Sequence, residues 1–338
     1  MSLNNSLKNN KFLQFIIVFL VFLQISMSEA VSWEFNFKFD NLFPIEVNNK
    51  WGYINSKGEI VIEPKYQAAY RFTDDLGLVK MDGKWGYINV GNKFIIAPIH
   101  KEAHQFSEGL ALVKIGERYG FINKAGQLFI KPRFDDAYGF SQGLSSVKYK
   151  SLWGFIDLNG DFIIPPTFDF ATSFSENYAL VIKGGLTGFI RKDGSYLVQP
   201  VFDSAKGFSQ GFASVVFEGQ PAFINKNGQM IITPTASEVE HFSEGMAVVK
   251  MKDLYGYIDI KGKLVIPHRY HKSGSFSEGF AAVKYQGKWG FINKEGKVTI
   301  SFKFKTVTPF KDGLSIVEFF DGNWGYINKN GEIVWSSD

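Results

Sequence analysis

The sequence contains no cysteine, few histidines and little net charge. With no cysteine among its 338 residues, the chain can form no disulfide and can carry no lipid on a cysteine, so its stability has to come from packing. The formal net charge is only +4, and lysine and arginine are interspersed with aspartate and glutamate. A nucleic-acid groove needs a concentrated basic patch, so this pattern argues against a nucleic-acid partner.

The N-terminus has the order of a targeting segment. Lys8 and Lys11 precede an apolar core at residues 12–23, and residues 28–30 offer a small-residue cleavage site. This order predicts a secretory signal peptide over residues 1–30. A membrane anchor would need about 20 apolar residues, whereas this core is short and contains Gln14. We expect export to the periplasm, the outer surface or the medium, with no membrane span after cleavage. Inner-membrane anchoring is the alternative if the leader is not cleaved.

A Trp-Gly pair, or a variant of it, recurs along the rest of the chain. The step is 34 residues throughout, except for a last step of 35. The nine copies begin at Trp51, Trp85, Tyr119, Trp153, Thr187, Pro221, Tyr255, Trp289 and Trp324. A fixed period of this size indicates one supersecondary unit that is copied and stacked.

Each copy predicts three short strands joined by tight turns. The first strand carries Trp-Gly and ends in an Asn/Asp-x-x-Gly turn, as at residues 123–126. The second strand is apolar on consecutive residues, as at 94–96, which predicts cover on both faces, and a proline such as Pro98 then ends its pairing. The third strand follows a Phe-Ser-Glu-Gly turn, as at 106–109.

These units predict an all-β tandem array of about nine three-stranded repeats. Helical repeats of the same period are excluded, because their helices could not tolerate a glycine hairpin and a proline in nearly every copy. Residues 31–50 hold a third strand without its first two, residues 51–323 hold eight full repeats, and residues 324–338 hold the first two strands. The two partial ends together complete one unit, as in a closed propeller-like ring. An open, twisted β-superhelix is the competitor, and we favour it slightly because nine blades are many for a ring.

The positions of the histidines indicate neither a metal centre nor a cofactor site. His100 and His104 have the spacing that binds a metal on a helix, but they occupy positions that are aromatic in other units. His268 and His271 lie in a connecting loop around Tyr270, which fills the same aromatic position. Replacement of an aromatic residue is the preferred interpretation of His100 and His104, and the two loop histidines give no stronger indication of a metal.

Two patterns imitate catalytic sites. Acidic residues recur in the turn before the third strand, like the paired carboxylates of glycoside hydrolases. They are Glu108, Glu176, Glu244 and Glu278, with Gln142 and Gln210 in two other units. Because these Glu and Gln residues recur at one position of the turn, we interpret them as residues that form the turn. Residues 139–143 and 207–211 spell the Gly-x-Ser-x-Gly of a hydrolase, but a strand follows where that motif needs a helix. We expect no enzyme.

The aromatic residues leave one functional lead. Tryptophans could stack on sugar rings if they faced a groove, but a ring repeated in each unit is expected to pack against the next unit. The period falters near residues 177–236, where Thr187, Pro221, Ala222 and Ala236 replace the expected residues. Such relaxed repeats are either sequence drift, which we prefer, or a surface shaped for a partner.

The chain resembles the WG-repeat family, also described as the KWG repeat of bacteria. The resemblance rests on residues 50–55, 62–66 and the closing Phe-Ser-Glu-Gly-Leu-Ala-x-Val segments, and it covers roughly residues 37–335. It implies a bacterial β-repeat interaction module, often exported, with no catalytic residues to carry over. We therefore expect a protein–protein interaction scaffold at or outside the bacterial cell envelope. A carbohydrate-binding module that uses exposed Trp or Tyr is the alternative, and a hydrolase is a distant third.

Overall fold

The computed structural model describes residues 41–232 and 235–337. The signal peptide expected over residues 1–30, most of the N-terminal segment and Pro234 lie outside these residues. The described residues form 35 strands and no helix. Accordingly, within this part of the chain we find no helix long and apolar enough to cross a membrane.

The repeating unit of the structure is a four-stranded antiparallel sheet. In one example, β12 (Asp136–Ala137), β13 (Ser145–Tyr149), β14 (Leu152–Ile156) and β15 (Phe162–Phe168) pair in chain order. The Trp-Gly pair lies in β14, and the strand that follows the Phe-Ser-x-Gly turn, β13, pairs with it. The three strands predicted for each repeat are therefore present, and the additional first strand of the four-stranded sheets, which has two residues in most of them, was missed.

The first sheet has only three strands: β1 (Phe43–Val47), β2 (Lys50–Ile54) and β3 (Ile60–Tyr66). The second contains β4 (Ala68–Thr73), β5 (Leu76–Met81), β6 (Lys84–Ile88) and β7 (Phe94–His100). The third contains β8 (Glu102–Ala103), β9 (Leu110–Ile115), β10 (Arg118–Asn123) and β11 (Leu128–Phe134). The sheet of β12 to β15 is the fourth.

The fifth sheet contains β16 (Phe170–Ala171), β17 (Tyr178–Lys183), β18 (Leu186–Arg191) and β19 (Tyr196–Phe202). The sixth contains β20 (Ser204–Ala205), β21 (Phe212–Phe217), β22 (Gln220–Asn225) and β23 (Met230–Ile232). The seventh contains β24 (Glu238–Ser243), β25 (Met246–Met251), β26 (Leu254–Asp259) and β27 (Leu264–Tyr270).

The eighth sheet contains β28 (Lys272–Ser273), β29 (Ala281–Tyr285), β30 (Lys288–Ile292) and β31 (Val298–Phe304). The ninth contains β32 (Thr306–Val307), β33 (Leu314–Glu318), β34 (Trp324–Asn328) and β35 (Ile333–Ser336).

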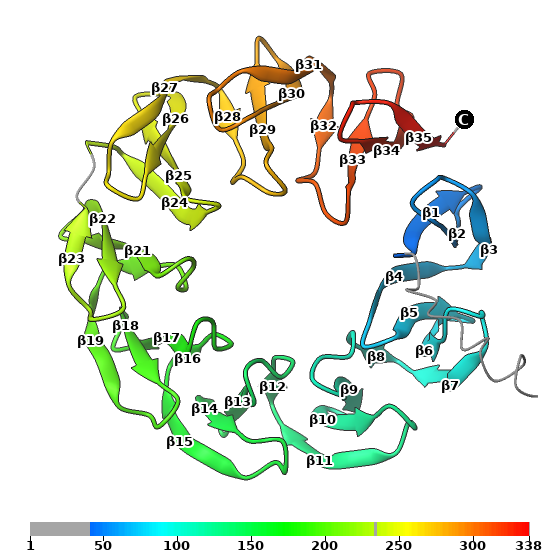
Figure 1. Cartoon of the computed structure of the whole chain (residues 1–338). Coiled ribbons are helices and arrows are strands. Elements are labelled where there is room, and N and C mark those ends of the chain that lie inside the picture. The colour runs from blue at the N-terminus through cyan, green and yellow to red at the C-terminus, as the bar shows by residue number, and fades with distance from the viewer. Residues whose placement is uncertain (1–40, 233–234, 338) are drawn as a thin grey trace, which may run out of the picture. The chain divides into compact units, whose positions relative to one another are not determined.

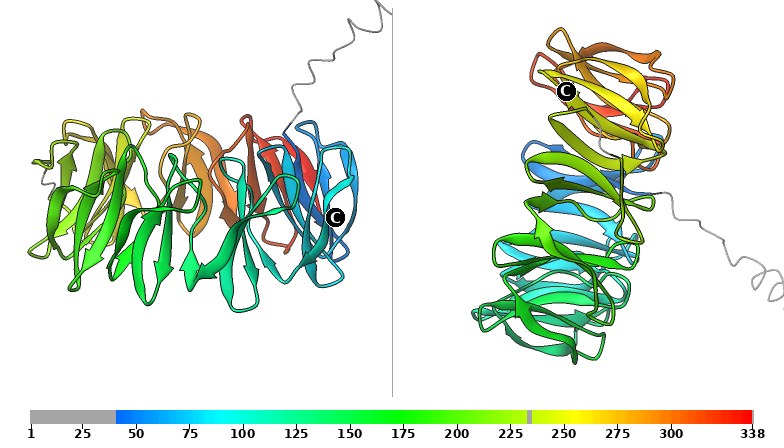
Figure 2. Two further views of the ribbon diagram at one scale, coloured as in Figure 1. Left: turned by 90° about the horizontal axis from the view of Figure 1, so that it is seen from below. Right: turned by 90° about the vertical axis from the view of Figure 1, so that its left-hand side faces the viewer.

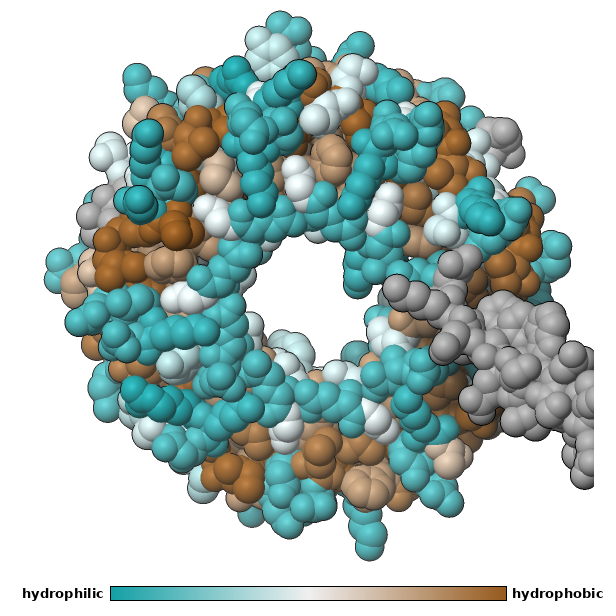
Figure 3. All heavy atoms as spheres, in the orientation of Figure 1, coloured by the Kyte–Doolittle hydropathy of each residue, from teal (hydrophilic) through white to brown (hydrophobic). Residues whose placement is uncertain are grey.

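The nine sheets of residues 41–337 stand as blades around a central channel, which makes a nine-bladed β-propeller (Figure 1). Strands such as β11 and β15 lie at the outer rim, and Figure 2 shows the blades edge-on as a single ring. Figure 3 shows hydrophilic side chains around the mouth of the channel and apolar patches farther out. The closed ring, one of the two predicted architectures, is confirmed, and the open superhelix that we favoured slightly is wrong.

Side-chain packing between the last sheet and the first closes the ring. Tyr326 Oη donates a hydrogen bond to the carbonyl oxygen of Pro44 at 2.8 Å, and its ring lies edge-on to Phe43 with the centroids 5.6 Å apart. Arg71 and Asp312 form an ion pair at 2.6 Å beside this contact. Among the described strands, none of the first sheet pairs with a strand of the last. The composite unit predicted from the two partial ends is therefore wrong.

Each blade packs on the next through one repeated aromatic pair. Phe155 of β14 contacts Phe174 of the following Phe-Ser turn, with centroids 4.9 Å apart, and both rings are almost fully buried. Equivalent pairs are Tyr53–Phe72, Tyr87–Phe106, Phe121–Phe140, Phe189–Phe208, Phe223–Phe242, Tyr257–Phe276 and Phe291–Phe310. Stacking of neighbouring blades supplies the core of a chain that has no disulfides.

The outermost strand of each blade is less covered than the sequence predicted. In β11, Ile130 is buried, whereas Leu128 is 47% exposed and Phe129 is 54% exposed. This strand has a partner on one side only and lies at the rim, so two of its three consecutive apolar residues face outward. The prediction of a strand covered on both faces is wrong.

The glycine of the Trp-Gly pair is required by a bulge in the neighbouring outer strand. Pairing shifts between Trp153↔Phe168 and Phe155↔Ile164, so β15 continues past Pro166, and the prediction that proline ends the pairing is wrong. The bulged backbone crosses over Gly154, where a Cβ would lie 2.5 Å from the carbonyl oxygen of Ile164 and 2.7 Å from the Pro166 nitrogen. Backbone atoms approach equally closely at Gly52, Gly86, Gly120, Gly188, Gly256 and Gly290. No side chain fits there without moving the strand.

Candidate functional site

The repeated tryptophan rings pack between blades. Trp153 is only 4% exposed, and Trp51, Trp85, Trp289 and Trp324 are partly buried against the apolar clusters of their blades. The interpretation of these rings as packing residues is confirmed. No tryptophan in the described residues is exposed, so these rings give no support to stacking on sugars.

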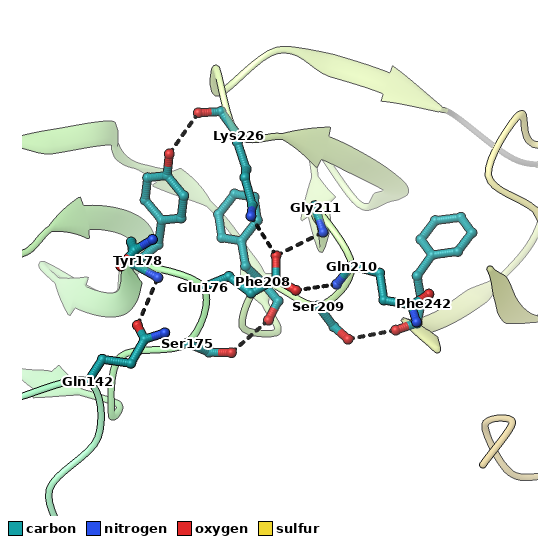
Figure 4. A network of polar contacts seen from close by, with 11 residues as sticks. Gln142, Ser175, Glu176, Tyr178, Phe208, Ser209, Gln210, Gly211, Lys226 and Phe242 are labelled. Atoms are coloured by element: carbon teal, nitrogen blue, oxygen red, sulfur yellow. Dashed lines mark hydrogen bonds and ion pairs between the residues drawn. The ribbon is translucent and has the colours of Figure 1, made fainter. Parts of the chain in front are cut away.

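The recurring acidic turn residues join one blade to the next. Glu176 has a left-handed backbone with φ of 50°, and its carboxylate accepts hydrogen bonds from the backbone N–H groups of Gln210 and Gly211 in the following turn. Lys226 adds an ion pair at 3.0 Å (Figure 4). Partial burial acts to raise the pKa of Glu176, but the bonds from Lys226, Gly211 and Gln210 outweigh it, so the pKa lies below the usual value.

The same arrangement recurs around the channel. Gln142 and Gln210 accept from the N–H groups of Asn177 and Gly245 in the next turn, at 2.8 Å and 2.6 Å. The backbone N–H groups of Gly143, Gly279 and Gly313 donate equivalent bonds to the carboxylates of Glu108, Glu244 and Glu278. Each of these side chains is bonded to the turn of the next blade, so it links neighbouring blades. We call this ring of turns the inner belt, and it explains the recurrence of Glu and Gln as a structural requirement.

Serine hydroxyls complete the inner belt. Ser141 Oγ donates to the carbonyl oxygen of Phe174 at 2.8 Å, and Ser209 Oγ donates to that of Phe242 at 2.7 Å. These are the serines of the two Gly-x-Ser-x-Gly matches. A strand follows each of them, as predicted, and the hydroxyl is already used to hold the neighbouring blade.

The histidines lie on separate elements. His241 is on β24 and His268 is on β27, so the loop position predicted for His268 is wrong, whereas His271 lies between strands as predicted. His100 is buried at the end of β7, in the position that Phe134 fills in β11, and burial lowers its pKa. His104 lies 3.7 Å from a carboxylate oxygen of Glu102 and is about half exposed. In the described residues, no group of three or more His, Asp or Glu side chains is placed to hold a metal ion.

A cleft opens between the sheet of β20–β23 and the sheet of β24–β27. Its volume is about 310 Å³. It is lined by Ser204, Ala205, Lys206, Ser214, Val215, Val216 and Pro221 of one blade and by Ser237, Glu238, Val239 and Glu240 of the next. We call this contact between blades the open interface.

A comparison with the contact two repeats earlier explains the cleft. Between the sheets of β12–β15 and β16–β19, which we call the filled interface, three aromatic rings pack together. Trp153 lies 5.5 Å from Tyr138 and 5.3 Å from Phe170, measured between ring centroids. The equivalent positions of the open interface hold Lys206, Pro221 and Glu238. A small proline thus stands where a large ring fills the space between two blades.

The cleft contains two kinds of polar group: one buried hydroxyl without a partner, and charged side chains that are paired. Ser214 is 3% exposed, and its hydroxyl has no hydrogen-bond partner among the described residues. At the mouth, Lys206 pairs with Glu240, and Lys250 pairs with Glu238 at 2.7 Å. The charges of the mouth therefore compensate one another, whereas the buried hydroxyl is left free.

The altered repeat also changes the residue over which the outer strand passes. Ala222 stands at the position of Gly154, where the bulged strand of the earlier blade crosses. The described part of β23 pairs with Phe223 and Ile224 of β22. The sequence identified this stretch by its loss of Trp-Gly, but it did not identify Lys206, Ser214, Glu238 or Glu240. Aligning successive repeats at the Tyr138 and Phe170 positions would have revealed Lys206 and Glu238, but not Ser214 or Glu240.

Comparisons with known proteins agree with this architecture. The profile of the family described as WG containing repeat matches residues 51–85, 85–119, 119–153, 153–186, 188–220, 222–255, 255–289, 289–323 and 324–334. No curated protein matches the sequence.

Solved structures are similar to the described fold. A structure described as a eukaryotic initiation factor has a TM-score of 0.64 at 12% identity, over 88% of this chain and 96% of that one. At this identity the likeness shows the propeller fold alone. BamB from Moraxella catarrhalis has a TM-score of 0.46 at 10% identity, over 76% of this chain and 97% of that one, which is too weak to carry an argument.

Proposed function

Because the chain belongs to the WG-repeat family, we propose that it is an exported, non-catalytic scaffold that binds another protein at or outside the bacterial cell envelope. Repeat arrays of this kind present large, rigid surfaces to partners. Export is inferred from the leader sequence of residues 1–30.

One observation carries the binding part of this proposal. The residues that recur in every repeat are occupied by packing or by the inner belt, as the bonds of Glu176 and Ser209 illustrate. The open interface departs from this pattern, because it has a cleft where the filled interface has a tryptophan. A partner can bind in this cleft because the packing between the two blades leaves it unfilled.

Crosslinking of the exported protein in intact cells, followed by affinity purification and mass spectrometry, tests the scaffold. We expect a stoichiometric protein partner that is absent from a culture without the tagged chain. A protein recovered alone at every crosslinker length would contradict the proposal. N-terminal sequencing of the exported form tests the leader, and retention of residues 1–30 in the membrane fraction would contradict its cleavage.

The carbohydrate alternative is tested by a glycan array together with tryptophan fluorescence. A glycan hit that also quenches the fluorescence of the whole chain would replace the protein scaffold by a sugar-binding function. Binding to a partner protein without any glycan hit is the expected result.

A further inference from the structure

The open interface has the shape of a position from which an aromatic ring has been removed. In the filled interface, Trp153 occupies the space between two blades and lies between Tyr138 and Phe170. Pro221 holds the equivalent position in the open interface, and the cleft of about 310 Å³ lies beside it. This volume is at the lower end of the range for ligand pockets and suits one side chain better than a large cofactor.

The lining of the cleft selects a neutral group. Val216, Val239 and Pro221 supply apolar walls, which favour a ring over a charged or strongly hydrated group. Lys206 and Glu240 neutralise each other at the mouth, and Lys250 neutralises Glu238. All four charged side chains are thus paired, and none of them is left to pair with an ionic ligand.

One buried polar side chain that lines the cleft has no hydrogen-bond partner among the described residues. Ser214 lies on β21 and lines the cleft, is 3% exposed, and its hydroxyl has no partner among the described residues. A buried hydroxyl without a hydrogen bond is unfavourable, so a ligand that supplies a donor or acceptor gains there. Ser146 holds the equivalent position in the filled interface and also lacks a described partner. The two serines therefore form a matched pair that differs in whether a ring of the chain itself already occupies the interface.

We propose that the cleft of the open interface binds a tyrosine side chain of a partner protein, whose ring takes the place that Trp153 takes in the filled interface and whose hydroxyl bonds to Ser214. This proposal rests on the scaffold function and names the anchor by which the partner is held. Buried aromatic side chains are the usual anchors of protein interfaces. Tyrosine combines the neutral ring that the walls favour with the polar group that Ser214 requires.

Binding of small probes to the whole chain tests the chemistry of the cleft. N-acetyl-tyrosinamide and N-acetyl-phenylalaninamide would be titrated up to ~20 mM, above the millimolar dissociation constants that so few atoms allow. Methyl NMR signals of Val216 and Val239 report on occupancy. We expect saturable shifts with both probes and about fivefold tighter binding of the tyrosine probe, which is the contribution of one hydrogen bond.

Variants separate the ring from the hydroxyl. Ser214→Ala should remove the preference for the tyrosine probe and leave the phenylalanine probe unchanged, whereas Ser146→Ala should change neither. Pro221→Trp should abolish binding of both probes, because the chain then fills its own cleft. Ser214→Leu is the second filling variant, since Leu112 and Leu180 hold the same position in other blades. Absence of methyl shifts at the highest concentration, or shifts that persist in both filled variants, would overturn the proposal.

A photo-crosslinking amino acid at the exposed Ser237, at the mouth of the cleft, tests the partner itself. We expect crosslinks in cells to a tyrosine-containing segment, and their loss when Pro221→Trp is added. A partner that crosslinks equally well to the filled protein would overturn the cleft as its anchor and leave the scaffold function standing. If intact-cell crosslinking recovers no partner, the scaffold fails, and no protein tyrosine remains for the cleft to hold. The amide probes would then report only a ring-binding pocket.

Discussion

The filled interface and the open interface are built on the same framework and differ in what lies between the blades. Both are joined at the inner belt by a glutamine, Gln142 or Gln210, and by a serine, Ser141 or Ser209. Three aromatic rings complete the first, whereas Lys206, Pro221 and Glu238 stand in the second. Because the belt is present in both, the belt and the aromatic filling are separate layers of the contact. The framework sets the spacing of the blades, and a cleft can form without breaking the ring.

The largest effect is expected from removing the central ring of the filled interface. Trp153→Ala should lower the free energy of unfolding by about 3–5 kcal/mol, because it leaves a cavity in a packed core. Pro221→Ala should cost about 1 kcal/mol or less, since no ring is lost there. Urea unfolding of both variants measures the difference. Equal losses would show that the two interfaces are packed alike and would contradict the comparison.

The second effect concerns the bulge. Gly154→Ala should cost about 2 kcal/mol, because its Cβ would lie 2.5 Å from the carbonyl oxygen of Ile164. The reverse change, Ala222→Gly, should cost only about 0.5–1 kcal/mol through backbone entropy, because the Ala222 side chain is already accommodated, buried in β22. Thermal unfolding of the two variants gives both values. A tolerated alanine at position 154 would disprove the role of the bulge.

The third prediction converts the open interface into the filled one. The triple variant Lys206→Tyr, Pro221→Trp and Glu238→Phe restores the aromatic residues of the filled interface. We expect a gain of about 1–2 kcal/mol, from ring contacts of the kind seen around Trp153. The same chemical denaturation measures it, and Lys206→Tyr alone is the control. A loss of stability would mean that the open blades are too far apart to be bridged by rings.

The smallest effect belongs to the belt between the two interfaces. The pKa of Glu176 is lower in the folded chain than its ordinary value of about 4.5, so its contribution is present above pH 4.5 and is lost as the pH falls through the folded value. Glu176→Gln should cost about 0.5 kcal/mol at pH 7, as for partly exposed ion pairs. Its stability should also fall less between pH 5 and pH 3. Urea unfolding at these pH values is the measurement, and an unchanged acid dependence would contradict the assignment.

Most of the architecture could be predicted from the period, but the sheet boundaries could not be read from the Trp-Gly pair alone. The hairpin that joins the third strand of one repeat to the Trp-Gly strand of the next was overlooked. Asp82 and Gly83 both have positive φ there, as a tight two-residue turn requires, and Asp-Gly is its usual sequence. The outward exposure of Phe129 was also missed, because a run of apolar residues looks the same on a central strand and on a rim strand.

The candidate site was predicted only as a stretch of altered repeats. Pro221 and Ala222 marked a blade that borders the cleft, because each departs from the Trp-Gly pair of other copies. Lys206 and Glu238 gave no such signal, since a charged residue next to a strand or at its first position looks ordinary until its partner ring is known to be missing. The cleft is a property of two neighbouring repeats together, and reading the repeats one at a time could not reveal it.

The contact between the first and last sheets has a consequence for how such proteins evolve. Each sheet is made of consecutive strands, and no described strand is shared between the first and last sheets. An in-frame duplication or deletion of one repeat in the gene would therefore add or remove a whole blade without leaving an orphaned strand. The circumference can vary by single steps, and Tyr326 and Phe43 need only meet again at the new diameter.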